Sequence, residues 1–560
     1  MASQITEQDI AGISNILQQI LANDNVQRKQ AEDQLNSAKS AETNKYALLM
    51  ASILDPALAS VSMEAKSLAA VILRRNISTE AIDAGDLANQ ENNENLWKRL
   101  SDDARTAVKT SILGTLQKVD ATNKTFMHKV CNVAVEIQGA MQDEEDSAIW
   151  QDLLNLLFQF IQGEVEAQID TALNIFNGLF SYILDHLVKY KNELGGIFER
   201  TLNFRTLDIK LAALQAIGNY LSVAERKDTK DFIRLLPLMT AVVTQAFAEE
   251  DETVLEDAIV EFNGLAEIEP NFFRNDFKSI YEQFKPIIAY KEFASATLRH
   301  QPLEFVVTMV ERKPSLMKKD EALTKDVLEQ IFQLMIDIDE EIDESWMRPK
   351  EGFQGEDEEE DNVNFGKTAV DRLVAGVGDA HMLPLIGQLV QNTIANDTDW
   401  RYKHAGIMAF SQVGEYVDEI DKIRPMMPII FQHVQHPNAK IRYAALHCIG
   451  QLADDMPGDF AKGFHAEALP VIMAALDDAV PRVQSHACAA LTNFAENGTK
   501  EMMMPFMQQL SQKLCILVKD GISMTKENAV TTLGTIVEKI GEDFNPYFQE
   551  TLTFLITYLD

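Results

Sequence analysis

One pattern recurs along this 560-residue chain at a spacing of about 40 residues. Four copies come into register at Tyr402, Ile441, Val483 and Thr525, whose numbers increase by 39, 42 and 42 in turn. Each copy has alanine three or four positions after that residue and an apolar side chain eight positions after it. Positions with these separations lie on one face of an α-helix. The chain is therefore predicted to build the same small-faced helix repeatedly.

The small residues have a physical reason. Alanine and glycine let helix backbones approach closely, while isoleucine, leucine and phenylalanine fill the remaining space. A helix pair of this size cannot bury its apolar face alone, but a stack of pairs can. Repeats of this length indicate HEAT or armadillo units. We therefore expect an all-α fold, a right-handed α-solenoid superhelix of tandem HEAT repeats with antiparallel A/B helix pairs, roughly a dozen or more in number.

The pattern extends upstream. Its clearest earlier copy is "DIKLAALQAIGNYL" at residues 208–221, and weaker copies start at Asn25, Met63, Thr125 and Val254. The last segment, "NPYFQETLTFLITYLD", is typical of an A helix without its B partner. We expect the solenoid to continue in a longer protein, because such a face requires a covering helix.

The charge of the chain is strongly acidic. Fifty Lys and Arg face 86 Asp and Glu, a formal net charge of -36, which disfavours direct DNA or RNA binding and favours basic partners. Solubility alone would also explain this balance. Thirteen acidic residues fall within residues 337–361, against Arg348 and Lys350. We expect this insert to be a solvated, mobile acidic loop between helices, a kind of segment that can also hold a basic ligand.

Motifs of enzymes and metal sites are missing from the sequence. No phosphate-binding loop, dinucleotide fingerprint, HExxH or GxSxG occurs. None of the four cysteines, Cys131, Cys448, Cys488 and Cys515, has the spacing of a zinc site. No uncharged apolar run is long enough to cross a bilayer. We expect no enzyme, no catalytic residues, no cofactor, no metal and no membrane insertion.

Four polar residues form an approximate ladder near the inner ends of the predicted B helices. They are Asp371, Glu415, Asp454 and Asn493, whose numbers increase by 44, 39 and 39 in turn. Acidic groups and an amide at such intervals suit an extended basic peptide, whose lysines and backbone groups they would hold. Spacing alone also allows them to be ordinary solvated helix ends.

Longer strings carry a family resemblance. The segments "DWRYKHAGIMAFSQVGEY", "HPNAKIRYAALHCIGQLADD" and "PRVQSHACAALTNFAEN" resemble repeats of the importin-5 group of β-karyopherins, the group of the importin-β superfamily that includes yeast Kap121. The likeness extends to "NVQRKQAEDQL", "AAVILRRNIS", "HKVCNVAVEI" and "AVDRLVAGVG". It covers most of the chain and is strongest over residues 368–497. Members of this group are about twice as long, so the resemblance is to their N-terminal half.

This resemblance implies a nuclear import receptor. Such a receptor binds cargo proteins with lysine-rich nuclear localisation signals, such as ribosomal proteins or histones, in the cytoplasm. It passes the nuclear pore through FG nucleoporins, releases cargo when Ran-GTP binds, and shuttles between cytoplasm and nucleus as a monomer. The family's Ran-GTP contacts correspond here to residues 28–34, 66–75 and 129–136. The ladder falls in the repeats that hold the signal, so the resemblance implies that Asp371, Glu415, Asp454 and Asn493 bind cargo.

Four regions follow. Residues 1–200 are expected to be N-terminal HEAT repeats with the Ran-GTP face, 201–336 middle repeats, 337–366 the acidic insert, and 367–560 repeats with the cargo face, ending within a repeat. The alternative is a static HEAT-repeat scaffold or regulatory subunit with no nucleotide-dependent partner.

Overall fold

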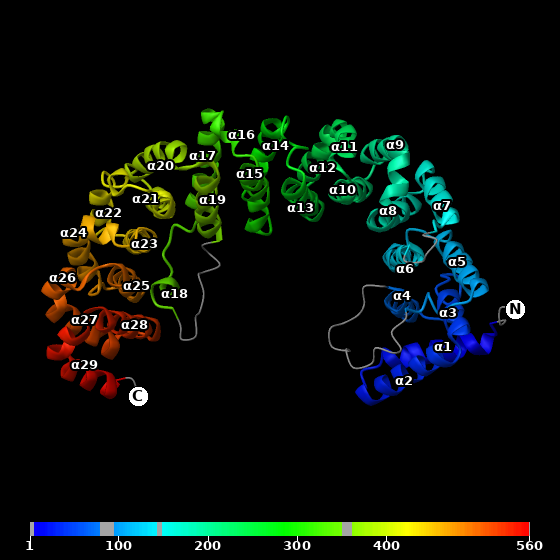
Figure 1. Ribbon diagram of the computed structural model, residues 1–560, viewed down its shortest axis with the longest axis horizontal. Helices are drawn as coiled ribbons and strands as arrows, with labels where there is room; N and C mark the ends of the chain where they lie inside the picture. Colours follow the sequence, from blue (N-terminus) through cyan, green and yellow to red (C-terminus); the bar gives the residue numbers. More distant parts are fainter. Residues whose placement is uncertain (1–4, 79–94, 143–147, 350–360, 559–560) are drawn as a thin grey trace. The chain divides into compact units, whose positions relative to one another are not determined.

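The computed structural model describes residues 5–78, 95–142, 148–349 and 361–558, and within these ranges it contains helices and no strand. The predicted HEAT-repeat solenoid is confirmed. The chain divides into two compact units, residues 1–273 and 274–560. Within each unit the A helices lie on one side and the B helices on the other (Figure 1).

Unit 1 alternates A and B helices. Its A helices are α1 (Glu7–Ile20), α3 (Thr43–Ser52), α5 (Asp102–Leu116), α7 (Gln151–Gln162), α9 (Lys191–Leu202) and α12 (Leu236–Ala248), the last preceded by α11 (Arg226–Thr229). Its B helices are α2 (Asn25–Ala41), α4 (Met63–Ile77), α6 (Lys124–Gln142), α8 (Glu166–Leu187), α10 (Leu207–Val223) and α13 (Glu252–Ile268). From α4 onward, successive B helices pack against one another. The predicted copies from Asn25, Met63, Thr125 and Val254 thus lie in B helices.

An aromatic cluster fills the centre of unit 1. Phe180, Phe198, Tyr220 and Phe232 come from both kinds of helix and are each at most 1% exposed. Their ring centroids lie 4.7 to 6.4 Å apart. The segment Arg226–Ala248, which contributes Phe232 to this cluster, is by length and composition apolar enough to cross a membrane. Its helix α12 packs against α10 and α13 as a core helix of the solenoid.

Unit 2 continues the alternation. Its A helices are α14 (Phe277–Ala289), α17 (Glu321–Ile336), α20 (Asp379–Ile394), α22 (Met427–His433), α24 (Asp459–Ala475), α27 (Met507–Asp520) and α29 (Asn545–Tyr558). Its B helices are α15 (His300–Arg312), α19 (Asp361–Val377), α21 (Trp400–Phe410) with the 3-10 extension η5 (Ser411–Tyr416), α23 (Ala439–Asp455), α25 (Pro481–Asn497) and α28 (Ser523–Ile540). Shorter helices are α16 (Ser315–Lys318), α18 (Glu344–Met347) and α26 (Lys500–Met503).

The repeated alanines lie in the packed interior between B helices, as predicted. All of them are 0% exposed: Ala405, Ala444, Ala445, Ala487 and Ala529. The approach is closest between α23 and α25, where a Cβ added to Gly450 would lie 3.1 Å from the Cα of Ala490. Small side chains therefore set the distance between neighbouring B helices.

The acidic insert departs from the expected solvated loop. Residues 337–349 are described and include α18, and the indole of Trp346 is only 2% exposed. The expectation is wrong for this part because a single large apolar side chain packs the segment onto the B helices. Helix α19 already begins at Asp361, and residues 350–360 lie outside the described residues.

Candidate functional site

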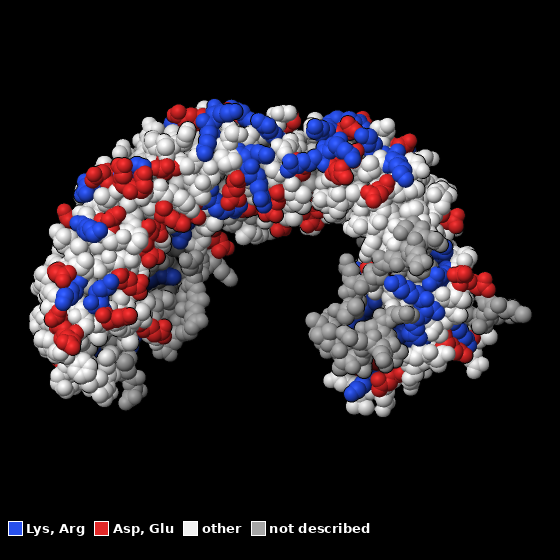
Figure 2. Space-filling view, viewed as in Figure 1, with Lys and Arg blue, Asp and Glu red and all other residues white. Residues whose placement is uncertain are grey.

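The four ladder residues lie toward the C-terminal ends of successive B helices in unit 2. Asp371 is in α19, Glu415 in η5, Asp454 in α23 and Asn493 in α25. Glu415 and Asp454 are exposed, whereas Asp371 and Asn493 are partly buried. Figure 2 shows Asp and Glu side chains gathered over α20, α21 and α23.

A glycine brings η5 onto α23. A Cβ built on Gly414 would lie 2.8 Å from the Cβ of Asp455 and 2.9 Å from Cδ2 of Leu452. Side chains larger than hydrogen therefore do not fit at this position without moving α23. The glycine holds the preceding and following residues of η5, including Glu415, beside the end of α23.

The pKa of Asp455 is raised in part by the neighbouring carboxylates. Burial first, and then the negative charges of Asp454, Glu415 and Asp371, raise the pKa of Asp455 to about 6, against a hydrogen bond from Gln451 that lowers it. The Gln451 amide nitrogen donates to Oδ1 of Asp455 at 2.7 Å. Three of the four predicted residues thus lie within electrostatic reach of one carboxyl group that the prediction omitted.

Tyr416 links two of these elements. Burial raises the pKa of its hydroxyl, and so do the nearby carboxylates of Asp371, Glu415 and Asp455. Because an ionised phenol would add a further negative charge here, the hydroxyl stays protonated. Tyr416 thus lies within electrostatic reach of Asp371 in α19 and Asp455 in α23.

The surrounding acids differ in having cationic partners. Arg372 pairs with Glu304 at 2.8 Å and with Glu311 at 2.7 Å, and the charge-assisted bonds raise the pKa of the guanidinium. In contrast, no described Lys, Arg or His forms an ion pair with Asp371, Glu415, Asp454 or Asp455. We call these four residues the acidic band. An external cation would relieve their mutual repulsion.

Asn493 lies one helix further along. Its Nδ2 donates to the carbonyl oxygen of Gly450 at 3.2 Å, which ties α25 to α23 where the two backbones are closest. The structure thus places it beside the acidic band with its amide nitrogen already used. Its predicted role in binding cargo stays a prediction, as do those of Asp371, Glu415 and Asp454.

Sequence reasoning missed Asp455 and Tyr416. Both directly follow a predicted ladder residue, in "VGEYV" and "LADDM". A weak signal was present, since Glu415 and Tyr416 precede Asp454 and Asp455 by one repeat. The repeat therefore duplicates a pair of polar positions, and neighbouring helices bring both members of each pair together.

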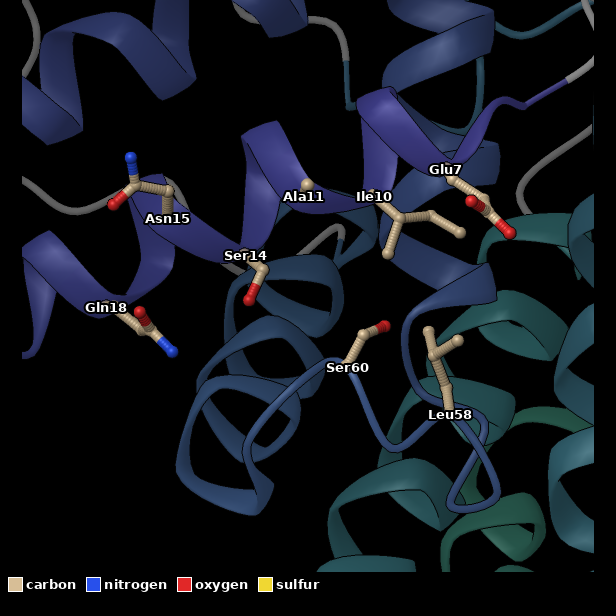
Figure 3. A pocket seen from close by; sticks show the side chains of 8 residues that line it. All are labelled: Glu7, Ile10, Ala11, Ser14, Asn15, Gln18, Leu58 and Ser60. Atoms are coloured by element: carbon tan, nitrogen blue, oxygen red, sulfur yellow. The ribbon is translucent and has the colours of Figure 1, made fainter.

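A hollow of unit 1 holds less chemistry. This cavity of ≈ 580 Å³ lies where Ile10, Ser14 and Gln18 of α1 face Leu58 and Ser60 of the α3–α4 connection (Figure 3). Its lining contains a single carboxylate and no histidine, lysine or cysteine. Within the part of the chain that the structure describes, no group of three or more His, Cys, Asp or Glu is arranged to hold a metal ion.

Family profiles match three parts of the chain. A profile described as IPO5-like TPR repeats matches residues 122–283, an importin repeat matches residues 291–384, and a HEAT repeat matches residues 426–456. The chain is built from repeats of the importin-β superfamily. Asp371 lies in the second matched segment, and the acidic end of α23 with Asp454 and Asp455 lies in the third.

Comparisons with whole proteins agree with these repeats. This chain is 22% identical to importin subunit beta-3 of Saccharomyces cerevisiae, over 100% of the chain and 50% of that relative. It is 20% identical to a probable importin-5 homolog of Dictyostelium discoideum, over 84% of the chain and 43% of the relative. It superimposes on crystalline Kap121p with a TM-score of 0.83 and 21% identity, covering 99% of the chain and 51% of Kap121p. The chain spans about half the length of the curated relatives that it matches.

Proposed function

We propose that this chain forms the cargo-binding part of a nuclear transport receptor, and that its acidic band holds lysines of a nuclear localisation signal. The observation that carries this proposal is the convergence of four carboxylates from three B-helix segments with no cationic partner among the described residues. Such a cluster is at lower free energy with a basic ligand bound.

Structures of a similar protein support this assignment. Kap121p has been crystallised bound to RanGTP and bound to Nup53p. A further structure is of a Kap121p mutant in which two aspartates and one glutamate are replaced by lysine. By analogy, we propose Ran-GTP, FG nucleoporins and basic cargo as partners of this chain, with shuttling between cytoplasm and nucleus.

The proposed binding mode follows from the geometry of the B helices. Each helix offers one or two carboxylates at its end, so an extended peptide crossing the helix ends meets acidic groups from α19, η5 and α23 in turn. Lysine side chains would bind Glu415 and Asp454, which are exposed, while Asp455 contributes its charge from a more buried position. The carboxamide oxygen of Asn493 would accept a backbone N–H of the same peptide.

Release by Ran-GTP would act through differential binding. A nucleotide-loaded partner that favours one curvature of the solenoid lowers the affinity for a peptide that requires another. In the proposal, Ran-GTP binds the B helices around residues 28–34, 66–75 and 129–136, and no covalent step is required of this chain.

A titration with two forms of Ran tests this function. A fluorescently labelled lysine-rich signal peptide is bound to the chain, and Ran loaded with GTP or with GDP is then added. We expect peptide binding before either addition and release with the GTP form only. Peptide binding that neither form alters would favour a static HEAT scaffold, and absence of peptide binding would refute the receptor proposal.

A further inference from the structure

Residues 337–349 cross the B helices of unit 2 as a strap. At its start, the carbonyl oxygen of Asp337 accepts from Nδ2 of Asn362 at 2.9 Å. Further along, the carbonyl of Ile338 accepts from Nη1 of Arg401 at 3.2 Å, and that of Glu340 accepts from Nε1 of Trp400 at 3.3 Å. These bonds use main-chain oxygens of the strap, so its acidic side chains after Ile338 stay exposed.

The strap ends in a cage for one indole. Trp346 meets Tyr443 edge to face, with ring centroids 5.6 Å apart at 73°. The guanidinium carbon of Arg482 lies 5.0 Å from the indole centroid, and Nζ of Lys440 lies 5.4 Å from it. Nη1 of Arg482 also donates to the carbonyl oxygen of Trp346 at 3.3 Å. We call Lys440, Tyr443 and Arg482 the indole cage.

The cage is an unusual place for cations. Lys440 is 1% and Arg482 7% exposed, so both charges have lost most of their hydration. Aromatic faces and carbonyl oxygens replace part of that hydration. The adjacent His404 and His486 stay neutral, since burial and the nearby cations lower the pKa of each to about 3. The cage thus combines an apolar slot with positive charge.

The occupant is complementary to that environment. Six acidic residues lie between positions 337 and 344, immediately before the buried indole. Asp339, Glu340, Glu341, Asp343 and Glu344 are exposed while Trp346 is buried. In a segment of this kind one aromatic ring is the anchor, and cations beside the ring favour an acidic flank over a basic one.

The cage and the acidic band lie at opposite ends of the B helices. Lys440 and Asp454 are 14 residues apart in α23, which at 1.5 Å per residue is about 21 Å. Arg482 and Asn493 are 11 residues apart in α25, or about 16 Å. The strap therefore occupies the N-terminal ends of these helices and leaves the acidic band uncovered.

We propose that the indole cage is a second peptide-binding surface, which takes an acidic segment anchored by one aromatic side chain, and that the strap is its resident occupant. A partner with such a segment binds α23 and α25 by displacing Trp346. This surface has the opposite charge preference from the acidic band, so one B-helix wall binds peptides of both signs at separate places.

Binding in trans tests the proposal. The probe is a labelled peptide of residues 340–349, "EEIDESWMRP", added to the whole chain carrying Trp346→Ala. We expect it to bind this variant at least tenfold more tightly than the wild-type chain, whose cage is filled in cis. On the Trp346→Ala chain, the same peptide with alanine in place of tryptophan should bind at least tenfold more weakly than the native peptide. The native peptide should lose at least tenfold in affinity when Arg482→Gln is added to the Trp346→Ala chain.

The result that overturns the proposal is binding that is equal on wild-type and Trp346→Ala chains, or unaffected by loss of the indole. A second measurement tests the proposal if the Trp346→Ala chain does not fold. In Arg482→Gln, hydrogen exchange of the Met347 and Arg348 amides, which donate to the carbonyls of Asp343 and Glu344, should accelerate at least tenfold, with exchange in α10 unchanged. Unchanged exchange in the strap would contradict the cage as its anchor.

Discussion

The pH dependence of peptide binding follows from Asp455. In the free chain its pKa is about 6, because burial and the charges of Asp454, Glu415 and Asp371 disfavour its ionised form. A bound lysine ammonium would favour ionisation and return the pKa toward the ordinary value of 3.8. Binding below pH 6 then requires loss of a proton. At pH 5 the group is about nine-tenths protonated, so affinity should be about tenfold lower than at pH 7.5, or about 1.4 kcal/mol.

Fluorescence anisotropy of a labelled lysine-rich peptide between pH 5 and 8 measures this effect. Asp455→Asn is the matched variant, since it keeps the shape and removes the titration. We expect peptide binding to the wild-type chain to tighten as pH rises through about 6. In Asp455→Asn, the change in affinity over the same pH range should be at least fivefold smaller. The same slope in both proteins would refute the reasoning, because the proton would then come from another group.

The remaining predictions concern stability, measured by urea unfolding followed by circular dichroism. The pKa of Asp455 is higher in the folded than in the unfolded chain, so its ionisation lowers stability as pH rises from about 4 to 6, by up to about 3 kcal/mol before solvent screening. Asp455→Asn should therefore stabilise the chain at pH 7.5 and have little effect at pH 3.5. A loss of stability at pH 7.5 would contradict this. Gly414→Ala should lower the free energy of unfolding by about 1–3 kcal/mol through its clash with Asp455. Gly387→Ala in α20, where an added Cβ meets nothing within 4 Å, should raise it by about 0.5–1 kcal/mol. Equal effects of the two variants would contradict the close approach of η5 and α23. Phe198→Ala should cost about 3–5 kcal/mol by opening the aromatic cluster of unit 1, and an effect smaller than about 1 kcal/mol would mean that the cluster is not tightly packed.

The repeats could be predicted from the sequence because their signal is local and recurs. The string around Ile441 specified α23, and the alanines at 444 and 445 are buried as the pattern requires. The helix N-terminus is also local: Asn438 caps α23 by accepting from the N–H groups of Lys440 and Ile441. Each of these features depends on residues within one or two helical turns.

The acidic band was predicted only in part. The repeat spacing predicted one polar residue on each B helix. The raised pKa of Asp455 comes first from its burial and then from neighbouring charges, which include Glu415 and Asp371 one and two repeats earlier. Spacing along the chain does not show which of two adjacent acids turns toward the neighbouring helix. That choice is made by the packing of Gly414 against α23.

The strap could not be predicted from its composition. A run of acids around one tryptophan is typical of a solvated segment, and the cage that buries Trp346 comes from Tyr443 and Arg482, which lie in repeats much further along the chain. Long-range contacts of this kind leave no periodic signal. The correction therefore required the three-dimensional arrangement of α18 against α25.

The most direct test of the account is the affinity of a lysine-rich signal peptide for a chain carrying Glu415→Lys and Asp454→Lys. Two attractive contacts become repulsive, and we predict weaker binding by about 2–3 kcal/mol, or about 30- to 150-fold at low salt. Glu467→Lys with Asp520→Lys makes the same charge change at exposed positions of the A helices α24 and α27, and should weaken binding less than threefold. Unchanged affinity in a folded Glu415→Lys, Asp454→Lys chain, or an equal loss in both variants, would contradict the acidic band as the peptide-binding surface.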